Sequence, residues 1–358
     1  MPANPRRPTP FSNCMTPEQV LDYPFAAPPA PGELAEVAPG VHWLRMPLPF
    51  ALDHINLWLL EDGEGFVIVD CGVGMDATRA LWERIFAERV GTRPVRRILA
   101  THCHPDHAGN AGWLGERFGA TLWMSQADYL TAHAWRDGAA GYTNDALLAF
   151  FRTHGLDDAR IEALRERGNR YRVLVPEFPG TYRRVVDGEE IALGGRAWRV
   201  VTGYGHAPEH VSLYCEPLGV FISGDMLLPR ISSHVGVTAV APDDDPVGLF
   251  LGSLARFADL LPAGTLVLPS HGLPFRGAQE RIAQLQEHHA LRLAEIEEAC
   301  AGPRSAAELL AVMFRRRLDT HQVFLALGEV IAHLNHLASR GCVSREAGAD
   351  GVIRFARA

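Results

Sequence analysis

The sequence predicts an α/β fold followed by a small, mostly helical C-terminal segment. Apolar runs that suit strands alternate with segments of helical periodicity along most of the chain. Aspartate and histidine residues stand directly after several of these runs, where open α/β sheets usually bind their ligands. Gly302 and Pro303 then separate this alternation from a compact helical pattern.

The expected strands are apolar runs bounded by turn residues, and Asp62 and Gly63 form the turn between two of them. We expect these strands within residues 41–50, 55–72, 96–102, 120–125, 182–203, 211–216, 219–225 and 264–272.

Helices are expected between the strands. Residues 75–90 place Leu81, Ile85 and Val90 on or near one helical face. A second helix, at 108–119, is expected to end at Gly119. The remaining helical signals are a helical insertion at about 130–175, a long helix at 279–300, and a helical C-terminal pattern that ends in a hairpin-like stretch at 342–358.

Three segments follow from these patterns. Residues 1–35 are rich in proline and are expected to form an irregular N-terminal arm. Residues 36–300 would form the α/β domain, and residues 301–358 a small C-terminal domain.

The composition is that of a globular protein, with 47% apolar residues among 358. The net charge of −8 works against non-specific nucleic-acid binding, because polyanions are attracted to basic surfaces. The six cysteines are scattered without a C-x-x-C pair, which indicates reduced thiols. The first residues lack the apolar stretch of a secretory signal, and no apolar run is long enough to span a membrane. We therefore expect a cytoplasmic protein without a membrane partner.

The densest motif is ILATHCHPDHAGN, which concentrates three histidines and an aspartate. In extended backbone His102 and His104 point to the same side, and Pro105 suits the first position of a helix. Asp106 and His107 would then lie in the first helical turn, so that a strand end and a helix start bring four ligand-type side chains together. Imidazole and carboxylate together suit zinc or a similar divalent ion.

Four further candidates stand just past the ends of expected strands. Taken singly, such a histidine is more often a hydrogen-bonded or solvent-facing residue, and an aspartate after glycine is more often a turn residue. Placed together, they could share one rim of a sheet with the histidine motif. They are Asp70, His206, Asp225 and His271.

The ordered motifs THCHPDHAGN, TGYGHAPEH, ISGD and LPSHG resemble those of the metallo-β-lactamase superfamily of hydrolases, over about residues 40–290. VIVDCGVG is similar to the strand end that precedes the histidine motif of this family. The resemblance implies an αβ/βα sandwich of two mixed sheets with a dinuclear metal site on its edge. The C-terminal segment resembles the small winged-helix-like domain attached to some of these hydrolases.

The same resemblance implies two divalent ions, with zinc expected and manganese or iron as alternatives. It implies a set of ligands for each ion and a carboxylate that bridges them: His102, His104 and His206 for the first ion, Asp106, His107 and His271 for the second, and Asp225 between the two. Asp70 resembles a residue that orients a ligand or the bridging water. His210 is expected to support the structure and not to bind metal, and Glu209 stands where the family usually has glycine.

This ligand set implies a hydrolase in which a metal-bridging hydroxide attacks a small ester, thioester or lactone. Asp225 would act in catalysis as the bridging ligand, and Asp106 could pass a proton to the leaving group. No protein nucleophile is needed, so Cys71 and Cys103 are expected to be dispensable for chemistry.

Three other activities remain open. The first is a nuclease that acts on single-stranded RNA, although the charge makes a small acyl molecule the expected partner and nucleic acid a less favoured one. The second is a non-catalytic binding or regulatory role, which the intact ligand set argues against. The third is sulfur dioxygenation at a single iron. Histidine at position 104 disfavours the diiron electron-transfer branch, and aspartate at position 225 disfavours the antibiotic-hydrolysing branch.

The helical insertion could form a lid over the site, or its aromatic residues could simply pack on the core. Those residues are Trp135, Tyr142, Phe150 and Phe151. The segment after Asp225 could line the pocket, with His234 as a pocket or surface residue and not a ligand.

The C-terminal domain contains a basic run, Arg315 to Arg317, which is most simply a solvated face. His333 and His336 recur at helical spacing, and without a third ligand we expect them on the surface. Packing, dimerisation into a homodimer, or a pocket wall is the expected role of this domain.

Overall fold

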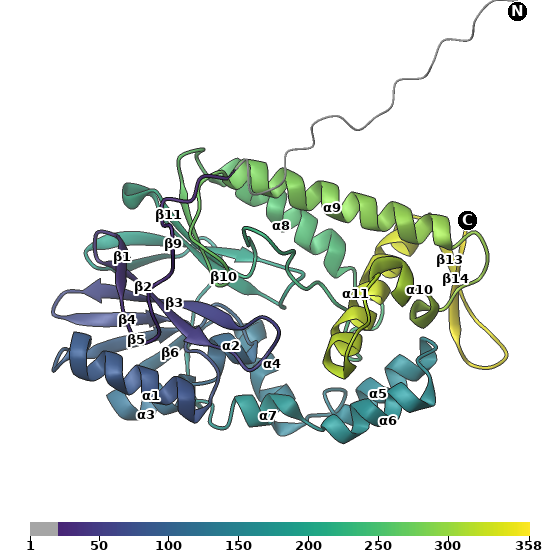
Figure 1. Cartoon of the computed structure of the whole chain (residues 1–358), viewed down its shortest axis with the longest axis horizontal. Coiled ribbons are helices and arrows are strands. Elements are labelled where there is room, and N and C mark those ends of the chain that lie inside the picture. The colour runs from purple at the N-terminus through teal and green to yellow at the C-terminus, as the bar shows by residue number, and fades with distance from the viewer. Residues whose placement is uncertain (1–20) are drawn as a thin grey trace, which may run out of the picture.

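Two mixed β-sheets lie face to face, with helices on both outer sides (Figure 1). The computed structural model describes residues 21–358. The αβ/βα sandwich expected from the sequence is confirmed. The predicted N-terminal arm lies outside the described residues up to residue 20, and residues 21–34 contain no strand or helix, only an isolated bridge from Asp22 to Arg276.

The first sheet contains β1 to β7 in chain order. Its first four strands pair antiparallel, and β4 to β7 pair parallel. The strands are β1 (Ala35–Ala38), β2 (Val41–Pro47), β3 (His54–Asp62), β4 (Gly65–Val69), β5 (Val95–Leu99), β6 (Thr121–Met124) and β7 (Arg183–Arg184).

The second sheet has the order β12-β11-β10-β9-β8, with β11 and β12 parallel and the other pairs antiparallel. Its strands are β8 (Glu190–Leu193), β9 (Arg196–Gly203), β10 (His210–Cys215), β11 (Val220–Gly224) and β12 (Leu266–Pro269). A 3₁₀ turn, η3 (Glu216–Leu218), connects β10 to β11. The inner faces of both sheets form one apolar layer in which Trp43, Trp58 and Trp198 are buried.

Helices cover the outer face of the first sheet. They are α1 (Asp76–Ile85), its π-helical continuation η2 (Phe86–Val90), α2 (Pro105–Ala108), α3 (Ala111–Phe118) and α4 (Gln126–Asp137). In α1 and η2, Ile85 and Val90 are buried as predicted, whereas Trp82 is buried in place of the half-buried Leu81. Gly119 ends α3 in a left-handed conformation (φ 63°), which costs glycine nothing.

The region expected to form a helical insertion continues beyond α4 with α5 (Asn144–Thr153), α6 (Asp158–Arg167) and α7 (Arg170–Leu174). Thr143, Asp157 and Asn169 precede these helices, and each side chain accepts a hydrogen bond from a backbone N–H of the first turn. Such caps explain why three short helices form in a segment with little shared periodicity.

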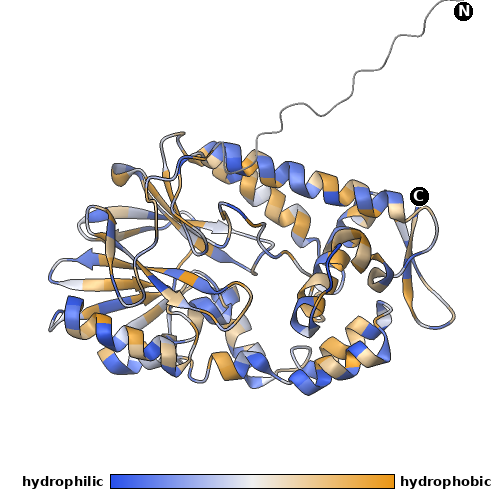
Figure 2. Ribbon diagram, in the orientation of Figure 1, coloured by the Kyte–Doolittle hydropathy of each residue, from blue (hydrophilic) through white to orange (hydrophobic). Residues whose placement is uncertain are grey.

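The second sheet is covered by α8 (Pro246–Leu260) and α9 (Ala278–Ala299). The sequence analysis expected no helix at α8, although Asp245 caps its N-terminus and Pro246 occupies its first turn. The helix was missed because it is apolar around most of its circumference, which hides the 3.6-residue period. Figure 2 shows hydrophobic residues along most of α8 and α11, whereas α9 carries many hydrophilic ones.

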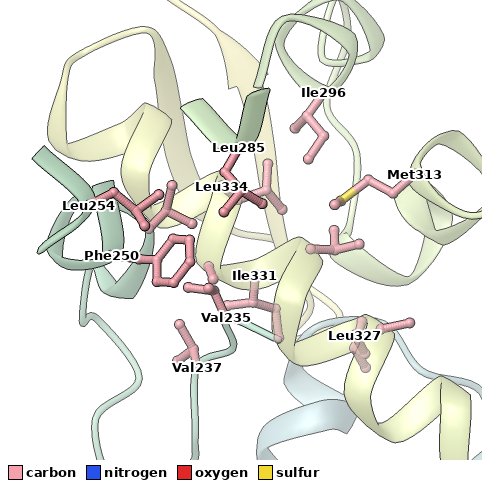
Figure 3. Packing of buried hydrophobic residues seen from close by; sticks show 14 of the residues in the cluster. Val235, Val237, Phe250, Leu254, Leu285, Ile296, Met313, Leu327, Ile331 and Leu334 are labelled. Atoms are coloured by element: carbon pink, nitrogen blue, oxygen red, sulfur yellow. The ribbon is translucent and has the colours of Figure 1, made fainter. Parts of the chain in front are cut away.

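The chain ends with α10 (Ala306–Met313), α11 (Thr320–Ser339) and a hairpin of β13 (Val343–Ala347) and β14 (Ile353–Arg357). These elements have no separate core. Phe250 of α8, Leu285 of α9 and Leu334 of α11 belong to one buried cluster, and Val235 and Val237 from the loop after β11 reach it as well (Figure 3).

The prediction that His333 and His336 lie on the surface is wrong, because both are buried in this cluster. The ring of His333 donates from Nδ1 to the Glu329 carbonyl (2.8 Å) and accepts at Nε2 from His289 Nδ1 (3.2 Å). His336 Nδ1 lies 3.0 Å from the Asp245 carboxylate that caps α8. Helices α6, α8 and α9 pack around α11, so little of its surface meets solvent. Within residues 21–358, no helix has both the length and the apolar composition to cross a bilayer.

Candidate metal centre

The candidate ligands lie where strands of both sheets end. After β5 the chain bends, and His104 precedes α2 with extended backbone (φ −63°, ψ 148°). Asp106 and His107 occupy the first turn of α2, as the sequence predicts. His206, Asp225 and His271 follow β9, β11 and β12. The two sheets therefore supply one shared edge at which the seven side chains meet.

The structure brings all seven of these residues together. Their ligand-type atoms form three overlapping groups, and within each group the atoms lie no more than 4.8 Å apart. The groups are His102, His104 and His206; His102, His107 and Asp225; and Asp106, His107 and His271.

The first group is a set of three imidazole nitrogens. His102 Nε2 lies 2.8 Å from His104 Nδ1 and 3.2 Å from His206 Nε2. His104 therefore presents Nδ1 to the site, whereas the other two present Nε2.

The group of Asp106, His107 and His271 combines imidazole and carboxylate. His271 Nε2 lies 3.5 Å from Asp106 Oδ2 and 3.4 Å from Asp225 Oδ1, and His107 Nε2 lies 3.5 Å from the same Asp225 oxygen. The other oxygen of Asp225, Oδ2, lies 3.3 Å from His206 Nε2. Asp225 therefore faces this group with one oxygen and the three-imidazole group with the other, and these two are called the donor groups below.

Hydrogen bonds on the outer side of the rings determine which nitrogens point inward as lone pairs. His206 Nδ1 donates to the carbonyl of His234 (2.7 Å), and His271 Nδ1 donates to the carbonyl of His54 (2.8 Å). His107 Nδ1 lies 2.8 Å from Asp70 Oδ2 and donates to it. Since each Nδ1 is engaged on the outer side, each Nε2 is the nitrogen that faces the site, where a metal ion would take the place of a proton.

Buried lone pairs that face one another repel unless a cation lies between them. His107 Nε2 and Asp225 Oδ1 have no hydrogen-bond partner among the described residues, although both are buried. The donor set fits a divalent ion with borderline preferences, such as zinc, at each group.

Burial and the neighbouring charged groups together determine the charge of each side chain in this cluster. Burial and then the neighbouring imidazoles hold the pKa of His102 well below its usual value, so this ring is neutral. Burial also opposes charge on His107, but the carboxylates of Asp70, Asp106 and Asp225 outweigh it and hold the pKa of His107 well above its usual value. Burial alone would raise the pKa of Asp225, yet His271 and His107 hold it well below. Asp225 is therefore ionised, as a metal-binding carboxylate must be.

Asp70 supports the site from beneath, as its place at the end of β4 suggested. Its side chain is fully buried, and its φ of 62° is the only positive value of a non-glycine residue within residues 21–358. Besides His107, the carboxylate accepts hydrogen bonds from the Thr101 backbone N–H (2.7 Å) and from the Thr101 hydroxyl (2.9 Å). This strained backbone, stabilised by hydrogen bonds to the next strand end, is typical of a functional site.

His210 has the supporting contacts that the sequence analysis expected. Its Nε2 accepts a hydrogen bond from the backbone N–H of Asp225 (3.1 Å). Gly224 makes this contact possible, because a Cβ atom there would lie 2.3 Å from the ring nitrogen and the residue has a φ of +54°. The ring thereby positions the Asp225 backbone.

Sequence reasoning missed Asp128, which is fully buried beside the site. Its carboxylate accepts hydrogen bonds from the backbone N–H groups of Cys103 (2.8 Å) and Glu209 (2.7 Å), and so joins the two loops that carry the histidines. The available signal was Ser125, which caps α4 three residues earlier and marks Asp128 as a residue of its first turn.

The aromatic residues of the helical insertion have two different environments. The ring of Trp135 is parallel to that of His104 within 11°, at 6.1 Å, and Tyr142 and Tyr171 contact Trp135. Phe150 and Phe151, in contrast, belong to the core shared with the C-terminal helices. Trp135 therefore borders the site, and the two phenylalanines have the packing role.

The cysteines beside the ligands are buried in surroundings that disfavour the thiolate form. Cys71 and Cys103 are fully buried, and burial raises the pKa of each thiol well above its usual value. All five cysteines within residues 21–358 are free thiols.

Two family models match this chain. The model described as "Metallo-beta-lactamase superfamily" matches residues 51–271, and the model described as "Metallo-beta-lactamase-like, C-terminal domain" matches residues 293–358.

Two solved structures are similar over almost the whole length. A beta-lactamase domain protein from Burkholderia ambifaria is 51% identical, with a TM-score of 0.89, over 96% of this chain and 99% of its own. The metallo-beta-lactamase family protein TTHA1429 from Thermus thermophilus is 32% identical, with a TM-score of 0.76, over 90% of this chain and 100% of its own.

Curated relatives are more distant. The probable metallo-hydrolase YqjP of Bacillus subtilis is 24% identical over 84% of this chain and 93% of its own length. The acyl-coenzyme A thioesterase MBLAC2 of Homo sapiens is 24% identical over 70% of this chain and 84% of its own. With its fold, its converging histidines and aspartates, and a family model that covers more than half of its length, the chain belongs to the metallo-beta-lactamase superfamily, as a metallo-hydrolase.

Proposed function

We propose that the chain is a dinuclear metal-dependent hydrolase that cleaves a small ester, thioester or lactone. The observation that supports this most directly is the pair of converging donor groups that share Asp225. In this proposal His102, His104 and His206 hold one ion, and Asp106, His107 and His271 hold the other. Zinc suits both donor sets, with manganese or iron as alternatives.

Two bound divalent ions would lower the pKa of a water molecule between them and polarise the carbonyl that it attacks. The residues of the chain supply the geometry. Asp225 neutralises charge on both sides of the site, and the carbonyls of His54 and His234 keep the rings of His271 and His206 in the required tautomer. The ring of Trp135 lies parallel to that of His104 on one side of the site.

A thioester is the first substrate to test. One relative is named as an acyl-coenzyme A thioesterase, and it is 24% identical over 70% of this chain. The nuclease alternative receives no comparable support. Arg315 of the basic run lies 3.6 Å from Glu295, and its side chain is 82% exposed, as expected of a solvated charged face.

Metal removal tests the proposal. Protein treated with a chelator is expected to lose turnover of acyl esters and thioesters, and two equivalents of zinc or manganese per chain are expected to restore it. Elemental analysis of the same preparation gives the stoichiometry, and the substrate panel includes a lactone and single-stranded RNA. A protein that carries two metal ions and cleaves none of the acyl substrates would contradict the proposal.

Asp106→Asn is expected to separate metal binding from proton transfer. If Asp106 protonates the leaving group, the variant loses about 10²- to 10⁴-fold in kcat with an alkyl thioester, whose thiolate needs a proton. With a 4-nitrophenyl ester, whose leaving group needs none, the loss is expected to be much smaller. Metal content is measured on the same sample. Equal losses on both substrates would assign Asp106 to metal binding alone, and full metal with full rate would remove both roles.

A further inference from the structure

The helical insertion and the C-terminal helix α11 form one rim of the candidate metal centre. Tyr171, in the first turn of α7, donates its hydroxyl to the carbonyl of Cys103 (2.6 Å), between His102 and His104 in the chain. Its ring also contacts Trp135 at 5.4 Å, and Trp135 stacks on His104. The start of α7 therefore lies directly beside the proposed ligands. In Figure 1, α11 lies between α8 and α9 on one side and α5 to α7 on the other.

Two arginines stand at this rim, where α6 ends and α7 begins. The guanidinium of Arg167 is half-buried, lies over the ring of Phe324 at 4.8 Å and donates to His321 Nδ1 on α11 (2.8 Å). Arg170 is exposed and lies close enough for its charge to act on Arg167. Burial and then Arg170 lower the pKa of Arg167, so the two cations destabilise each other.

The partners of these arginines contain no carboxylate. Within residues 21–358 neither guanidinium forms an ion pair, and the only polar partner of Arg167 is an imidazole. Asp319 lies within electrostatic range of Arg167, but its carboxylate caps α11 by accepting from the Gln322 backbone N–H (2.8 Å). Arg165, two residues before Arg167 in α6, forms ion pairs with Glu162 (3.2 Å) and Asp145 (3.3 Å).

His321 connects the arginines to the opposite side of the site. Its ring stacks on Phe50, in the loop between β2 and β3, at 5.6 Å and within 23°. The same loop leads into His54, whose carbonyl holds His271. Burial and then the charge of Arg167 lower the pKa of His321, so the neutral ring can accept the hydrogen bond of Arg167.

From this arrangement we propose that Arg167 and Arg170, with His321, form a subsite for an anionic group of the substrate, a phosphate or a carboxylate remote from the bond that is cleaved. Guanidinium groups recognise both anions through paired charge-assisted hydrogen bonds. An anionic ligand would supply the counter-charge that these two guanidinium groups lack at the rim of the site, and their positive charge would attract it to a chain whose net charge is −8. The inference rests on the proposed hydrolase function and narrows its substrates to acyl derivatives that carry negative charge.

Matched pairs of thioesters test the subsite. In the first pair the same acyl group is carried by 4′-phosphopantetheine, which has a phosphate, or by pantetheine, which has none. In the second pair it is carried by 3-mercaptopropionate, which has a carboxylate, or by the neutral N-acetylcysteamine. In the wild-type protein the anionic member of at least one pair is expected to have a kcat/KM about tenfold higher. The pair that shows the difference identifies phosphate or carboxylate as the recognised group. Equal kcat/KM values within both pairs would overturn the inference.

Three variants assign the effect. The ratio of kcat/KM for the anionic member to kcat/KM for the neutral member is expected to fall close to one in R167Q/R170Q, because KM for the anionic member rises. R170Q alone changes an exposed position and is used if the double variant is unstable. R165Q removes an arginine that is already paired and is expected to keep the wild-type ratio. A ratio that survives in R167Q/R170Q and in R170Q would contradict the proposal.

A binding measurement separates this inference from the proposed reaction. Titration calorimetry of the metal-loaded protein with 4′-phosphopantetheine, pantetheine and 3-mercaptopropionate reports on the subsite even if no thioester is cleaved. Tighter binding of either anion by wild type and R165Q than by R167Q/R170Q supports the subsite. Binding that is equal among all three proteins, or absent for both anions, counts against it.

Discussion

Asp225→Asn is expected to reduce kcat/KM by roughly 10³-fold or more, because the substitution removes a carboxylate that faces both donor groups. Asparagine has nearly the same shape, so the loss measures charge and not packing. The side chain is buried, and its Oδ1 atom has no hydrogen-bond partner among the described residues. An amide nitrogen turned towards His107 or His271 would place a donor where a cation must bind.

Metal content distinguishes the two ways in which this loss could arise. We expect Asp225→Asn to retain at most one ion per chain in elemental analysis, with the three imidazoles of the first group as its remaining ligands. Asp259→Asn changes an exposed carboxylate of α8 in the same way and is expected to keep wild-type activity and metal. An Asp225→Asn protein with two ions and near-normal kcat/KM would show that the shared carboxylate is not required.

The sequence predicted the two sheets, and it placed the candidate ligands at strand ends that the structure brings together, because both depend on side chains with strong local preferences. The motif from His102 to His107 combines a strand end, a helix-starting proline and adjacent ligand-type residues, so its local geometry follows from backbone rules. His206, Asp225 and His271 lie far from this motif in the sequence. They could be identified as candidate ligands only from the order of their motifs along the chain, which resembles that of a known family. The structure brings these residues together with the histidine motif.

Other parts of the site could not be predicted, for physical reasons that differ from residue to residue. The carbonyls of His54 and His234 hold two of the rings, and any residue at those positions would offer the same atom. Asp128 acts by accepting from two backbone N–H groups brought together by folding, a relation with no sequence period. The burial of His333 and His336 depends on packing against α8. The sequence analysis did not predict this helix, because its apolar residues surround most of its circumference and give no 3.6-residue period.

The positioning role of Asp70 leads to the second large effect. Asp70→Asn is expected to weaken metal binding about 10- to 100-fold, the usual consequence of losing a residue that orients a ligand. The carboxylate now accepts from His107 Nδ1 and leaves Nε2 free to face the site. An asparagine side chain can turn its NH₂ group towards His107, so that Nδ1 accepts, Nε2 becomes protonated, and the ring can no longer bind a cation.

Comparison with Asp70→Ala separates this tautomer effect from backbone strain. Asparagine, unlike alanine, readily adopts the positive φ of 62° found at this position, so it removes the charge and keeps the backbone conformation. In excess chelator we expect Asp70→Asn to lose about 1.5–3 kcal/mol of unfolding free energy, from hydrogen bonds to an ionised acceptor, and Asp70→Ala to lose more. Urea denaturation gives these values, and competition with a chromogenic chelator gives the metal affinity. If Asp70→Asn bound metal as tightly as the wild type, the tautomer of His107 would not depend on Asp70.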